Sequence, residues 1–425
     1  MHSPRALLDD LRNTCFSPGE SSAGGTPHVG MEAEAIVVDA ATRRPFPLEP
    51  TFSPRATVPA VRRLAETYGW EAHPTGSAGV PEFQLPDGGR ITFEPGGQVE
   101  YSSAPRPSAS EVLSVTRDVL GLLGHALHDV GAELVFAGLD PVNAVEDTAL
   151  QLRGDRYVRM DRHFWRIGPS GARMMRQSAS LQFALDWGAP DGRAARWTLL
   201  NALAPYLTAI FANAPQYAGK ATGHHSYRRV VWDTLDPLRT GLRETGPRAE
   251  EEYLAFALDA PAILIPGGAR PCAPFGRWLA TGCVTMDDWR EHLSTLFPEV
   301  RPRGYLEVRT VDALAPEWYA APMALLLGLT HDERSARDAR DLLGNPDPSL
   351  LARAGRDAVS DPQIGAVARD LWSIALRGCA RLGATSISAE DVETAAEYAS
   401  RYTGTSRTPA DDALARADTF ASAAG

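Results

Sequence analysis

Two glutamates flank a glycine-rich turn in the segment Arg90–Pro105, which reads RITFEPGGQVEYSSAP. Glu94 precedes the Pro-Gly-Gly turn, and Glu100 follows it. The flanking residues 91–94 and 98–102 read as strands, so each acid shares one face with polar neighbours. Carboxylates gathered beside a glycine-rich bend are typical of a place where a cation or a phosphate approaches the backbone.

The same alternation recurs in three other expected strands. Each has one apolar face and one polar face. The polar face carries Glu32 and Glu34 in the first strand, Ser180, Gln182 and Asp186 in the second, and Glu307 and Arg309 in the third. This pattern predicts an antiparallel sheet that is backed by helices and leaves its acidic face open as a cleft.

Converging carboxylates need protons or cations nearby, because two unit charges about 4 Å apart repel by roughly 4 kcal/mol at an effective dielectric constant of 20. Oxygen ligands without thiolates or imidazoles favour Mg²⁺ or Mn²⁺, commonly shared with substrate phosphates. Arginines would then bind those phosphates or a substrate carboxylate. The candidates are Arg176, Arg228, Arg239 and Arg309.

Each signal also has an ordinary structural interpretation. A Glu-x-Glu strand is usually a solvated face, a Pro-Gly-Gly bend is usually only a turn, and an isolated Glu-x-Arg pair contributes little energy. A loop pair such as His224-His225 is more often structural, and Cys283 has no arrangement that indicates a nucleophile. The chain contains no G-x-x-x-x-G-K-[ST], H-E-x-x-H or G-x-S-x-G motif. Only the combination of acidic strands indicates a site.

Composition bounds the function. The 425 residues are 44% hydrophobic and 22% charged, and the net charge of -11 opposes non-specific nucleic-acid binding. The apolar segment Trp318–Leu329 is too short to span a bilayer, and no long apolar run marks a signal peptide. Four cysteines without a C-x-x-C pair favour reduced thiols. We expect a cytoplasmic protein that binds small molecules, with no nucleic-acid or membrane partner; its oligomeric state is left open.

Periodicity predicts one α+β catalytic domain over residues 1–425, with sheet and helices in 28–330 and a helical region in 331–425. Residues 16–28 read as a loop, and strands are expected at Met31–Asp39 and Glu133–Ala137. Ser108 and Glu111 form a capping pattern for a helix that Gly131 closes. Further helices are expected at Ala194–Ala212, Glu250–Leu258 and Met286–Leu296, and through most of Glu317–Tyr402.

Five blocks carry a family resemblance: GMEAE (30–34), ITFEPGGQVEYSSAP (91–105), MMRQSASLQFALD (174–186), TGHHSYRRVVWDTLDPLRTG (222–241) and HLSTLFPEVRPRGYLEVRTVD (292–312). In these blocks, and in their order, the chain resembles the second family of glutamate–cysteine ligases, the plant and actinobacterial type. EPGGQxE followed by YLExR is a specific combination. The last block, the chain length and RTPADD (407–412) most resemble the actinobacterial type that serves ergothioneine biosynthesis.

The resemblance implies a glutamine-synthetase-like sheet and an ATP-dependent ligation. ATP would phosphorylate the side-chain carboxylate of glutamate, and the amine of L-cysteine would attack the resulting γ-glutamyl phosphate. Two or three Mg²⁺ ions, or Mn²⁺, would be held by Glu32, Glu34, Glu94, Glu100 and Glu307. Arg309 and Arg228 would face the transferring or leaving phosphates, Arg176 and Arg239 the glutamate α-carboxylate, and Gln98 and Gln182 would make nearby polar contacts.

Three departures from the family pattern bear on the acceptor. His224-His225 stands where relatives often carry Trp and another residue, Phe183-Ala184 replaces Val-Asn, and Tyr101 replaces Leu. The alternatives are therefore the same chemistry with another amine, or a non-catalytic homologue that binds a nucleotide or an amino acid. Retention of all five acids disfavours the non-catalytic alternative.

Overall fold

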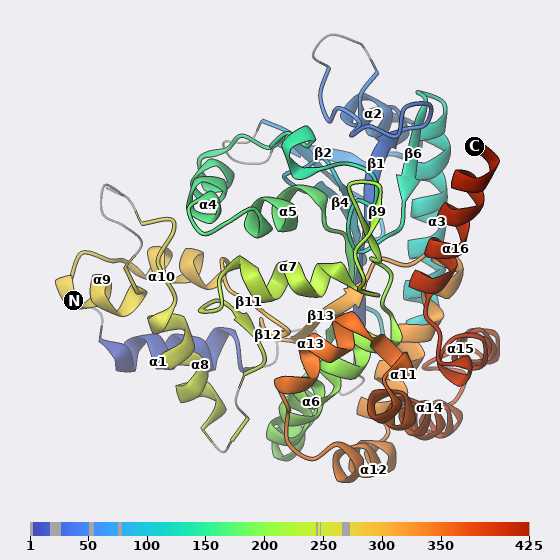
Figure 1. Ribbon diagram of the computed structural model, residues 1–425. Helices are drawn as coiled ribbons and strands as arrows, with labels where there is room; N and C mark the ends of the chain where they lie inside the picture. The colour runs from blue at the N-terminus through green and yellow to red at the C-terminus, as the bar shows by residue number, and fades with distance from the viewer. Residues whose placement is uncertain are drawn as a thin grey trace.

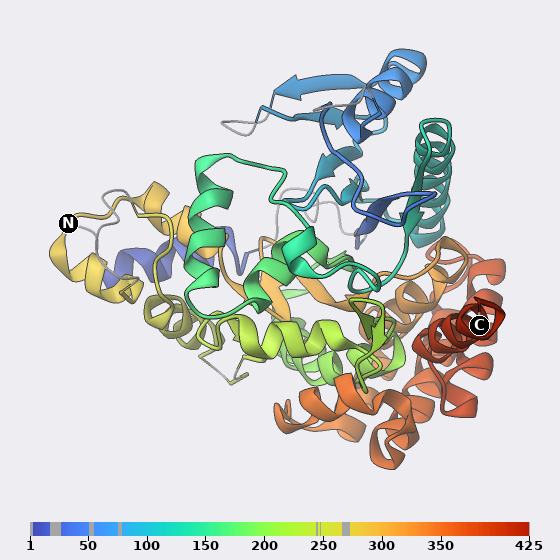
Figure 2. The ribbon, with the colours of Figure 1, turned by 45° about the horizontal axis from the view of Figure 1, so that its top comes forward.

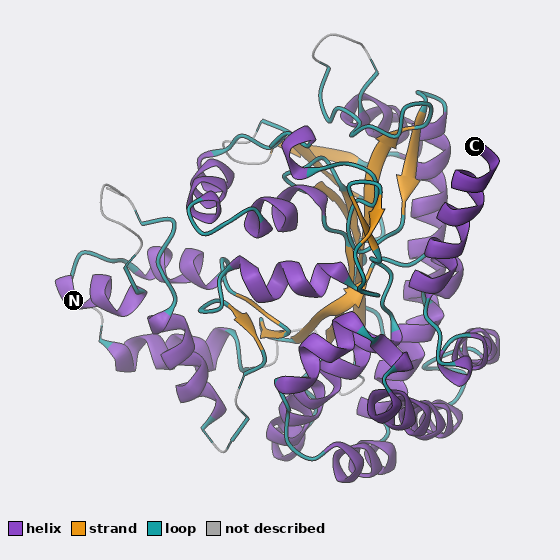
Figure 3. Cartoon of the chain, in the orientation of Figure 1, coloured by secondary structure: helices purple, strands orange, loops and turns teal. Residues whose placement is uncertain are grey.

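The computed structural model describes residues 3–17, 27–50, 55–74, 79–243, 245–246, 248–265 and 273–424, the last seven as backbone only. Strands and helices mix up to residue 312, and helices follow from residue 320 (Figure 1 and Figure 3). The α-helices are α1 (Pro4–Thr14), α2 (Thr57–Tyr68), α3 (Ala109–His128), α4 (Asp155–Trp165), α5 (Ser170–Gln177), α6 (Arg193–Ile210), α7 (Tyr227–Leu235), α8 (Ala249–Asp259), α9 (Phe275–Thr281), α10 (Met286–Leu293), α11 (Ala320–Thr330), α12 (Glu333–Leu343), α13 (Ser349–Arg356), α14 (Pro362–Leu382), α15 (Ala389–Arg401) and α16 (Pro409–Ala424).

The strands form one large antiparallel sheet and two short ribbons. They are β1 (Val29–Asp39), β2 (Glu71–Pro74), β3 (Pro81–Gln84), β4 (Arg90–Phe93), β5 (Val99–Ser102), β6 (Ala132–Val135), β7 (Ser180–Leu185), β8 (Gln216–Tyr217), β9 (Lys220–Ala221), β10 (Thr240–Gly241), β11 (Phe297–Pro298), β12 (Val300–Pro302) and β13 (Leu306–Asp312). In the described residues, nine of them join in the order β12-β13-β7-β1-β5-β4-β3-β2, and β6 also pairs with β1.

The long strand β1 is the centre of this sheet. It pairs with β7 and β5 through residues 29–35 and with β6 through residues 36–39. The register sets Glu34 opposite Glu100 and Glu32 opposite both Ser102 and Gln182. Side chains that are far apart in the sequence are thereby aligned in rows across one face.

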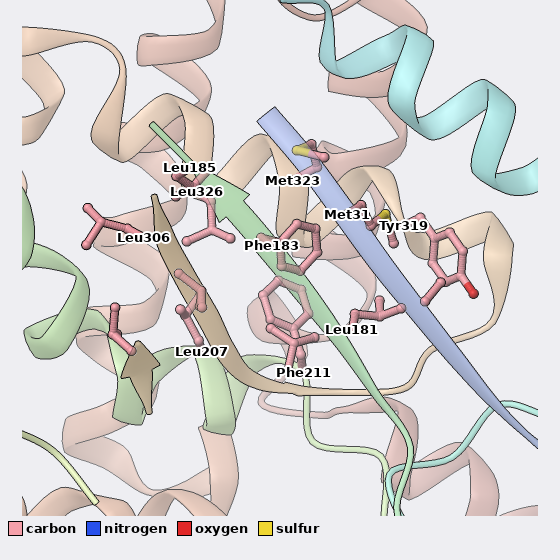
Figure 4. Close-up of a cluster of buried hydrophobic side chains, with 14 of the residues drawn as sticks. Met31, Leu181, Phe183, Leu185, Leu207, Phe211, Leu306, Tyr319, Met323 and Leu326 are labelled. Carbon is pink, nitrogen blue, oxygen red and sulfur yellow. The ribbon is translucent and has the colours of Figure 1, made fainter. Parts of the chain in front are cut away.

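The opposite face of the sheet is apolar and packs on helices. Figure 4 shows Met31, Leu181, Phe183, Leu185 and Leu306 facing Leu207 of α6, Phe211 just after that helix, and Met323 and Leu326 of α11. All of these side chains are buried. The apolar half of the strand alternation therefore makes the core, and this leaves the acidic half to face the other way.

Helix α11 lies inside the molecule and explains how the C-terminal region attaches to the sheet. Every residue from Ala320 to Thr330 is buried, between the sheet and helices α14 and α15. A Cβ on Gly328 would lie 2.1 Å from the carbonyl oxygen of Ala375, so glycine permits this close approach. Figure 2 shows the C-terminal helices, in orange and red, gathered on one side of the molecule.

The expected α+β class and antiparallel sheet are confirmed, as are the strand at 31–39 and the helix capped by Ser108, whose hydroxyl accepts a bond from the Glu111 amide. Some boundaries differ. Glu94 and Gln98 lie in the turn just outside β4 and β5, where the Glu94 amide donates to the Gln98 carbonyl at 2.9 Å. Helix α10 ends at Leu293, because the chain must turn to pair β11 with β10.

Three further expectations concern loops, thiols and membranes. The loop expected at 16–28 falls largely outside the described residues. Cys15, Cys283 and Cys379 are free thiols, as predicted, and Cys272 lies outside the described residues. Within the described chain, every helix is too short or too polar to cross a bilayer.

Candidate active site

The acidic face of the sheet forms the floor of a cleft of about 310 Å³, which we call the acidic cleft. The strands β1, β5 and β7 and the turn before β5 supply the floor, and helices α4, α5 and α7 lie along one side (Figure 1). Four of the five predicted glutamates line it: Glu32, Glu34, Glu94 and Glu100. The strand register therefore brings together carboxylates from two segments about 60 residues apart.

Glu34 is the most enclosed of these four carboxylates. It accepts hydrogen bonds from the amide and hydroxyl of Ser180, at 2.8 and 3.2 Å, and from Nε2 of Gln182 at 2.7 Å. Burial raises its pKa, although the charges of Arg228 and Arg309 oppose the shift. Glu34 is thus held rigidly on the floor by β7.

The other three carboxylates repel one another. Burial and the charges of Glu100 and Glu307 raise the pKa of Glu32 to about 8. Burial and the charge of Glu34 raise the pKa of Glu100 to about 7, although the Thr92 hydroxyl donates to it at 2.7 Å. The pKa of Glu94 is raised well above its ordinary value by burial and by Glu100. Burial first, and repulsion between neighbouring glutamates second, therefore disfavours the ionised form of these three carboxylates.

Glu307 has the opposite environment. It is 2% exposed and does not line the acidic cleft. Arg301 binds both of its carboxylate oxygens, at 2.5 and 3.0 Å, and Arg309 donates to one of them at 3.1 Å. Burial favours the neutral acid, but these arginines outweigh burial and hold the pKa of Glu307 below its ordinary value. Its negative charge is already satisfied.

Arg309 and Arg228 lie side by side at the edge of the acidic cleft. Arg309 donates to Oε1 of Gln182 and to Glu307. Arg228 donates to the carbonyl oxygen of Arg309 at 3.0 Å and stacks on Trp232, with its guanidinium carbon 4.3 Å from the ring centroid. The Nε atoms of both arginines are buried without a hydrogen-bond partner among the described residues. These two Nε–H groups can therefore donate hydrogen bonds to an anionic ligand.

The other two predicted arginines are not brought into the acidic cleft. Arg176 donates to Asp161 at 2.5 Å and to the Thr148 carbonyl. Arg239 is completely buried, and its guanidinium binds Asp236, Thr295 and the Pro261 carbonyl. These partners leave no geometric basis for the expected contact with a substrate α-carboxylate.

Both predicted glutamines line the acidic cleft. Gln98 accepts from the Gly96 amide at 3.0 Å and donates to the Ser178 carbonyl at 2.8 Å, so it fixes the glycine-rich turn against β7. Gln182 bridges Glu34 and Arg309. Each glutamine connects floor elements to one another, and each is positioned beside the carboxylates.

Sequence reasoning missed several cationic residues of the acidic cleft. Arg156, from α4, reaches the hydroxyl and carbonyl of Ser294 at 2.8 and 3.2 Å, and it had no motif to mark it. Arg301 and Arg303 belong to the hairpin formed by β12 and β13. Pairing residues 300–302 with 306–308 in register would have set Arg301 opposite Glu307. That signal was present in the sequence.

The departures from the family pattern lie in different places. His225 bonds through its amide to the Arg356 carbonyl and contacts Thr408, and neither histidine of the pair lines the acidic cleft. Ala184 is half-buried on the acidic side of β7, paired with Gly30 on β1 and Glu307 on β13. Only the change at 184 is on the face that carries the site.

The acidic cleft suits cations by charge, although its side chains do not converge. Among the described residues, no three His, Cys, Asp or Glu side chains meet closely enough to hold a metal ion. Glu32, Glu94 and Glu100 nevertheless share a region in which burial and their mutual repulsion disfavour ionisation. Carboxylate oxygens are ligands that Mg²⁺ and Mn²⁺ prefer, and these three side chains would bind such an ion by rotating toward a common point.

Comparison with known proteins relates the whole described sheet and its helices to one family. The model of Glutamate-cysteine ligase family 2 matches residues 28–422. Glutamate–cysteine ligase EgtA of Mycolicibacterium smegmatis is 34% identical over 408 residues, covering 92% of this chain and 87% of that protein. The chloroplastic glutamate–cysteine ligase of Nicotiana tabacum is 28% identical over 381 residues, covering 84% and 70%.

A solved structure shares the fold at low sequence identity. The glutamate–cysteine ligase of Francisella tularensis, solved in complex with AMP, superposes with a TM-score of 0.53 at 11% identity, covering 92% of this chain and 84% of that one. At this identity the likeness concerns the fold alone.

Proposed function

The chain belongs to glutamate–cysteine ligase family 2, an ATP-dependent carboxylate–amine ligase family, and we propose that it joins the γ-carboxylate of glutamate to the amine of L-cysteine through a γ-glutamyl phosphate. The observation that carries this proposal is the acidic cleft, which four glutamates line together with the arginine pair Arg228 and Arg309. Such a site suits a reaction whose substrates are polyanions.

The first step would be phosphoryl transfer. An oxygen of the glutamate γ-carboxylate attacks the γ-phosphorus of ATP, a new P–O bond forms, and the bond to ADP breaks. Arg309 and Arg228 supply donors for the transferring group, with Gln182 and Glu307 orienting Arg309. Catalysis of this kind is mainly positioning and charge stabilisation.

Divalent cations would complete the acidic cleft. Glu32, Glu34, Glu94 and Glu100 are the residues that would hold two or three Mg²⁺ ions, and Mn²⁺ would serve the same donors. When bound, such ions neutralise phosphate oxygens and make the γ-phosphoryl group more electrophilic. Glu307 is already paired with Arg301 and Arg309, so we now assign it to the orientation of those arginines instead of to metal binding.

The second step would form the amide. The amine nitrogen attacks the acyl carbon, the C–O bond to phosphate breaks, phosphate leaves with the electron pair, and the nitrogen loses a proton. The identity of the amine is the open part of the proposal. Ala184, on the acidic side of β7, is the departure that could change it, so another small amine with the same chemistry is the second candidate.

An amine panel tests the proposed function. The protein is incubated with ATP, Mg²⁺ and glutamate, and ADP and product mass are recorded for each amine. We expect ADP, phosphate and γ-glutamylcysteine with cysteine. Turnover only with a different amine would show that this amine, and not cysteine, is the acceptor in the same reaction. Absence of turnover with every amine would contradict the ligase assignment.

A further inference from the structure

A second cavity of about 260 Å³ adjoins the acidic cleft, and we call it the side pocket. Its lining includes Cys15, Tyr253, Leu293, Ser294, Arg301 and Arg303. Three of these residues, Ser294, Arg301 and Arg303, also line the acidic cleft. The two cavities therefore share a wall built from the end of α10 and from the β12–β13 hairpin.

The acidic cleft alone is small for the proposed reaction. Sites that bury one drug-sized ligand usually measure about 300–1,000 Å³. The acidic cleft, at about 310 Å³, is at the lower end of that range, yet the proposed ligation needs a nucleotide and two amino acids. The adjoining side pocket offers room for one of them.

The side pocket differs from the acidic cleft in its charged lining residues. No carboxylate is among its lining residues in the described chain, whereas Arg290, Arg301 and Arg303 all contribute to it. These arginines, with no lining carboxylate to compete for them, would attract an α-carboxylate. An amino acid would therefore hold its carboxylate in the side pocket and extend its amine toward the acidic cleft.

Arg303 is the arginine best able to bind such a carboxylate. Arg301 already binds Glu307 through two bonds, and Arg290 is paired with Asp10 at 2.8 Å. The side chain of Arg303 is 51% exposed, and its contact with Glu307 is long, at 3.5 Å. Its backbone is fixed, since its amide bonds to the Tyr305 carbonyl and the next residue, Gly304, bonds to the Cys15 carbonyl.

The remaining wall suits a small, weakly polar side chain. Leu293, Tyr253, Pro302 and Cys15 present apolar or thiol surface. Burial raises the pKa of the Cys15 thiol, so that side chain is neutral at physiological pH. A neutral wall of this kind excludes charged side chains and accepts a thiol or a short aliphatic group.

We propose that the side pocket is the subsite for the amine-donating amino acid of the ligation, with Arg303 binding its α-carboxylate and Leu293 and Cys15 contacting its side chain. This inference rests on the proposed function, since it assumes an amino-acid acceptor. It adds where the acceptor amino acid binds, which arginine binds its α-carboxylate, and how large its side chain can be.

The test measures KM separately for ATP, glutamate and cysteine in the full-length protein. Arg303→Gln removes the charge, and Leu293→Trp fills the cavity without changing charge. Both should raise KM for cysteine by about 10- to 100-fold, the range expected for loss of a hydrogen bond to a charged group, with KM for ATP and glutamate unchanged. The matched control is Arg12→Gln, because Arg12 is paired with Glu250 and Glu251 outside both cavities.

The outcomes separate this inference from the proposed function. A rise in KM for ATP or glutamate, or unchanged kinetics in both variants, contradicts the subsite while the wild-type protein still makes product. If the wild-type protein makes no γ-glutamyl product with any amine, the proposed function fails and the subsite fails with it. Thermal melting of each variant shows whether it is folded, and Leu293→Trp and Arg303→Gln perturb different elements.

Discussion

At the scale of single residues, one sheet face carries glutamates in two opposite states. Glu32, Glu34, Glu94 and Glu100 have raised pKa values because they are buried together, whereas Glu307 has a lowered pKa because arginines surround it. Protons or bound cations would relieve the first group, whereas Glu307 is already paired with arginines. This contrast explains why the four cleft acids, and not Glu307, are the proposed cation ligands.

Glu94→Gln tests that proposal. We expect kcat to fall by on the order of 100-fold or more, because a proposed cation ligand is lost while the shape of the side chain is kept. Without Mg²⁺ the variant should be at least as stable as the wild type, since repulsion by Glu100 and Glu34 is relieved. Steady-state kinetics and thermal melting provide the measurements. The exposed Glu66→Gln is the matched control, and near-normal turnover in Glu94→Gln would remove the metal assignment.

Single residues differ in how far the sequence predicts them. Alternation along strands is local, so it correctly grouped Glu32 with Glu34 and set Gln182 on the same face. The pairing of Arg239 with Thr295 and Pro261 depends on distant loops and has no local signal. Arg156 likewise reaches the acidic cleft only because α4 packs across it.

At the scale of elements, helix α7 connects the C-terminal region to the site. Arg228 points to β13, while the next residue, Arg229, binds the buried Glu299. The start of α7 is tied to α13, where the Ser226 amide bonds to the Gly355 carbonyl at 2.8 Å. A Cβ on Gly355 would lie 2.6 Å from Cβ and Cγ of Arg229. Glycine at 355 therefore sets how closely α13 supports α7.

Gly355→Ala should shift α7 and displace Arg228, because the added Cβ would lie only 2.6 Å from Cβ and Cγ of Arg229. We expect kcat to fall on the order of tenfold, with a smaller change in KM. Misplacement of a catalytic group reduces the stabilisation of the transition state more than it reduces binding of the substrate in the ground state. The matched control is Gly121→Ala in α3, where an added Cβ meets nothing within 4 Å. That control should gain about 0.5–1 kcal/mol of stability with unchanged kinetics. Equal kcat and KM values in the two variants would show that the packing of α13 on α7 does not position Arg228.

The start of helix α12 predicts a pH dependence of stability. Asp332 caps the helix by accepting from the Ser335 amide at 2.8 Å, and Arg381 binds the same carboxylate. Hydrogen bonds from Arg381, together with the Ser335 bonds, lower the pKa of Asp332 from 3.8 to about 2. A lowered pKa stabilises the folded state above pH about 4, and this contribution is lost as pH falls toward 2.

Asp332→Asn keeps the capping oxygen and removes the charge. We expect the variant to unfold at a lower urea concentration than the wild type at pH 7, and the gap should narrow as pH falls below 4. Urea unfolding of both proteins between pH 7 and pH 3 gives the measurement. A gap that stays constant over that range would show that the ion pair with Arg381 contributes nothing.

At the scale of the whole molecule, the sheet and the C-terminal helices share one core. The strand alternation and the antiparallel fold class followed from the sequence, because both depend on short-range periodicity. The burial of α11 between the sheet and α14 depends on the close contact of Gly328 with Ala375, which periodicity does not show. The prediction of a single catalytic domain is therefore best tested by truncation.

A chain that ends at residue 330 should fail to fold cooperatively, because α11 would expose residues that α14 and α15 now cover. Near-ultraviolet circular dichroism and gel filtration would show lost tertiary structure and aggregation. A chain that ends at residue 408 lacks only α16 and should keep a cooperative transition. A folded, monodisperse 1–330 fragment would show that the two regions are separate domains.

We propose that glutamate is activated as an acyl phosphate in the acidic cleft. Glutamate labelled with ¹⁸O in its γ-carboxylate tests this claim directly, with mass spectrometry of the phosphate released in the presence of ATP, Mg²⁺ and cysteine. The attacking carboxylate oxygen becomes the bridge to phosphorus and leaves with phosphate, so each phosphate released should carry one ¹⁸O atom. Unlabelled phosphate, or release of AMP and pyrophosphate, would contradict the mechanism.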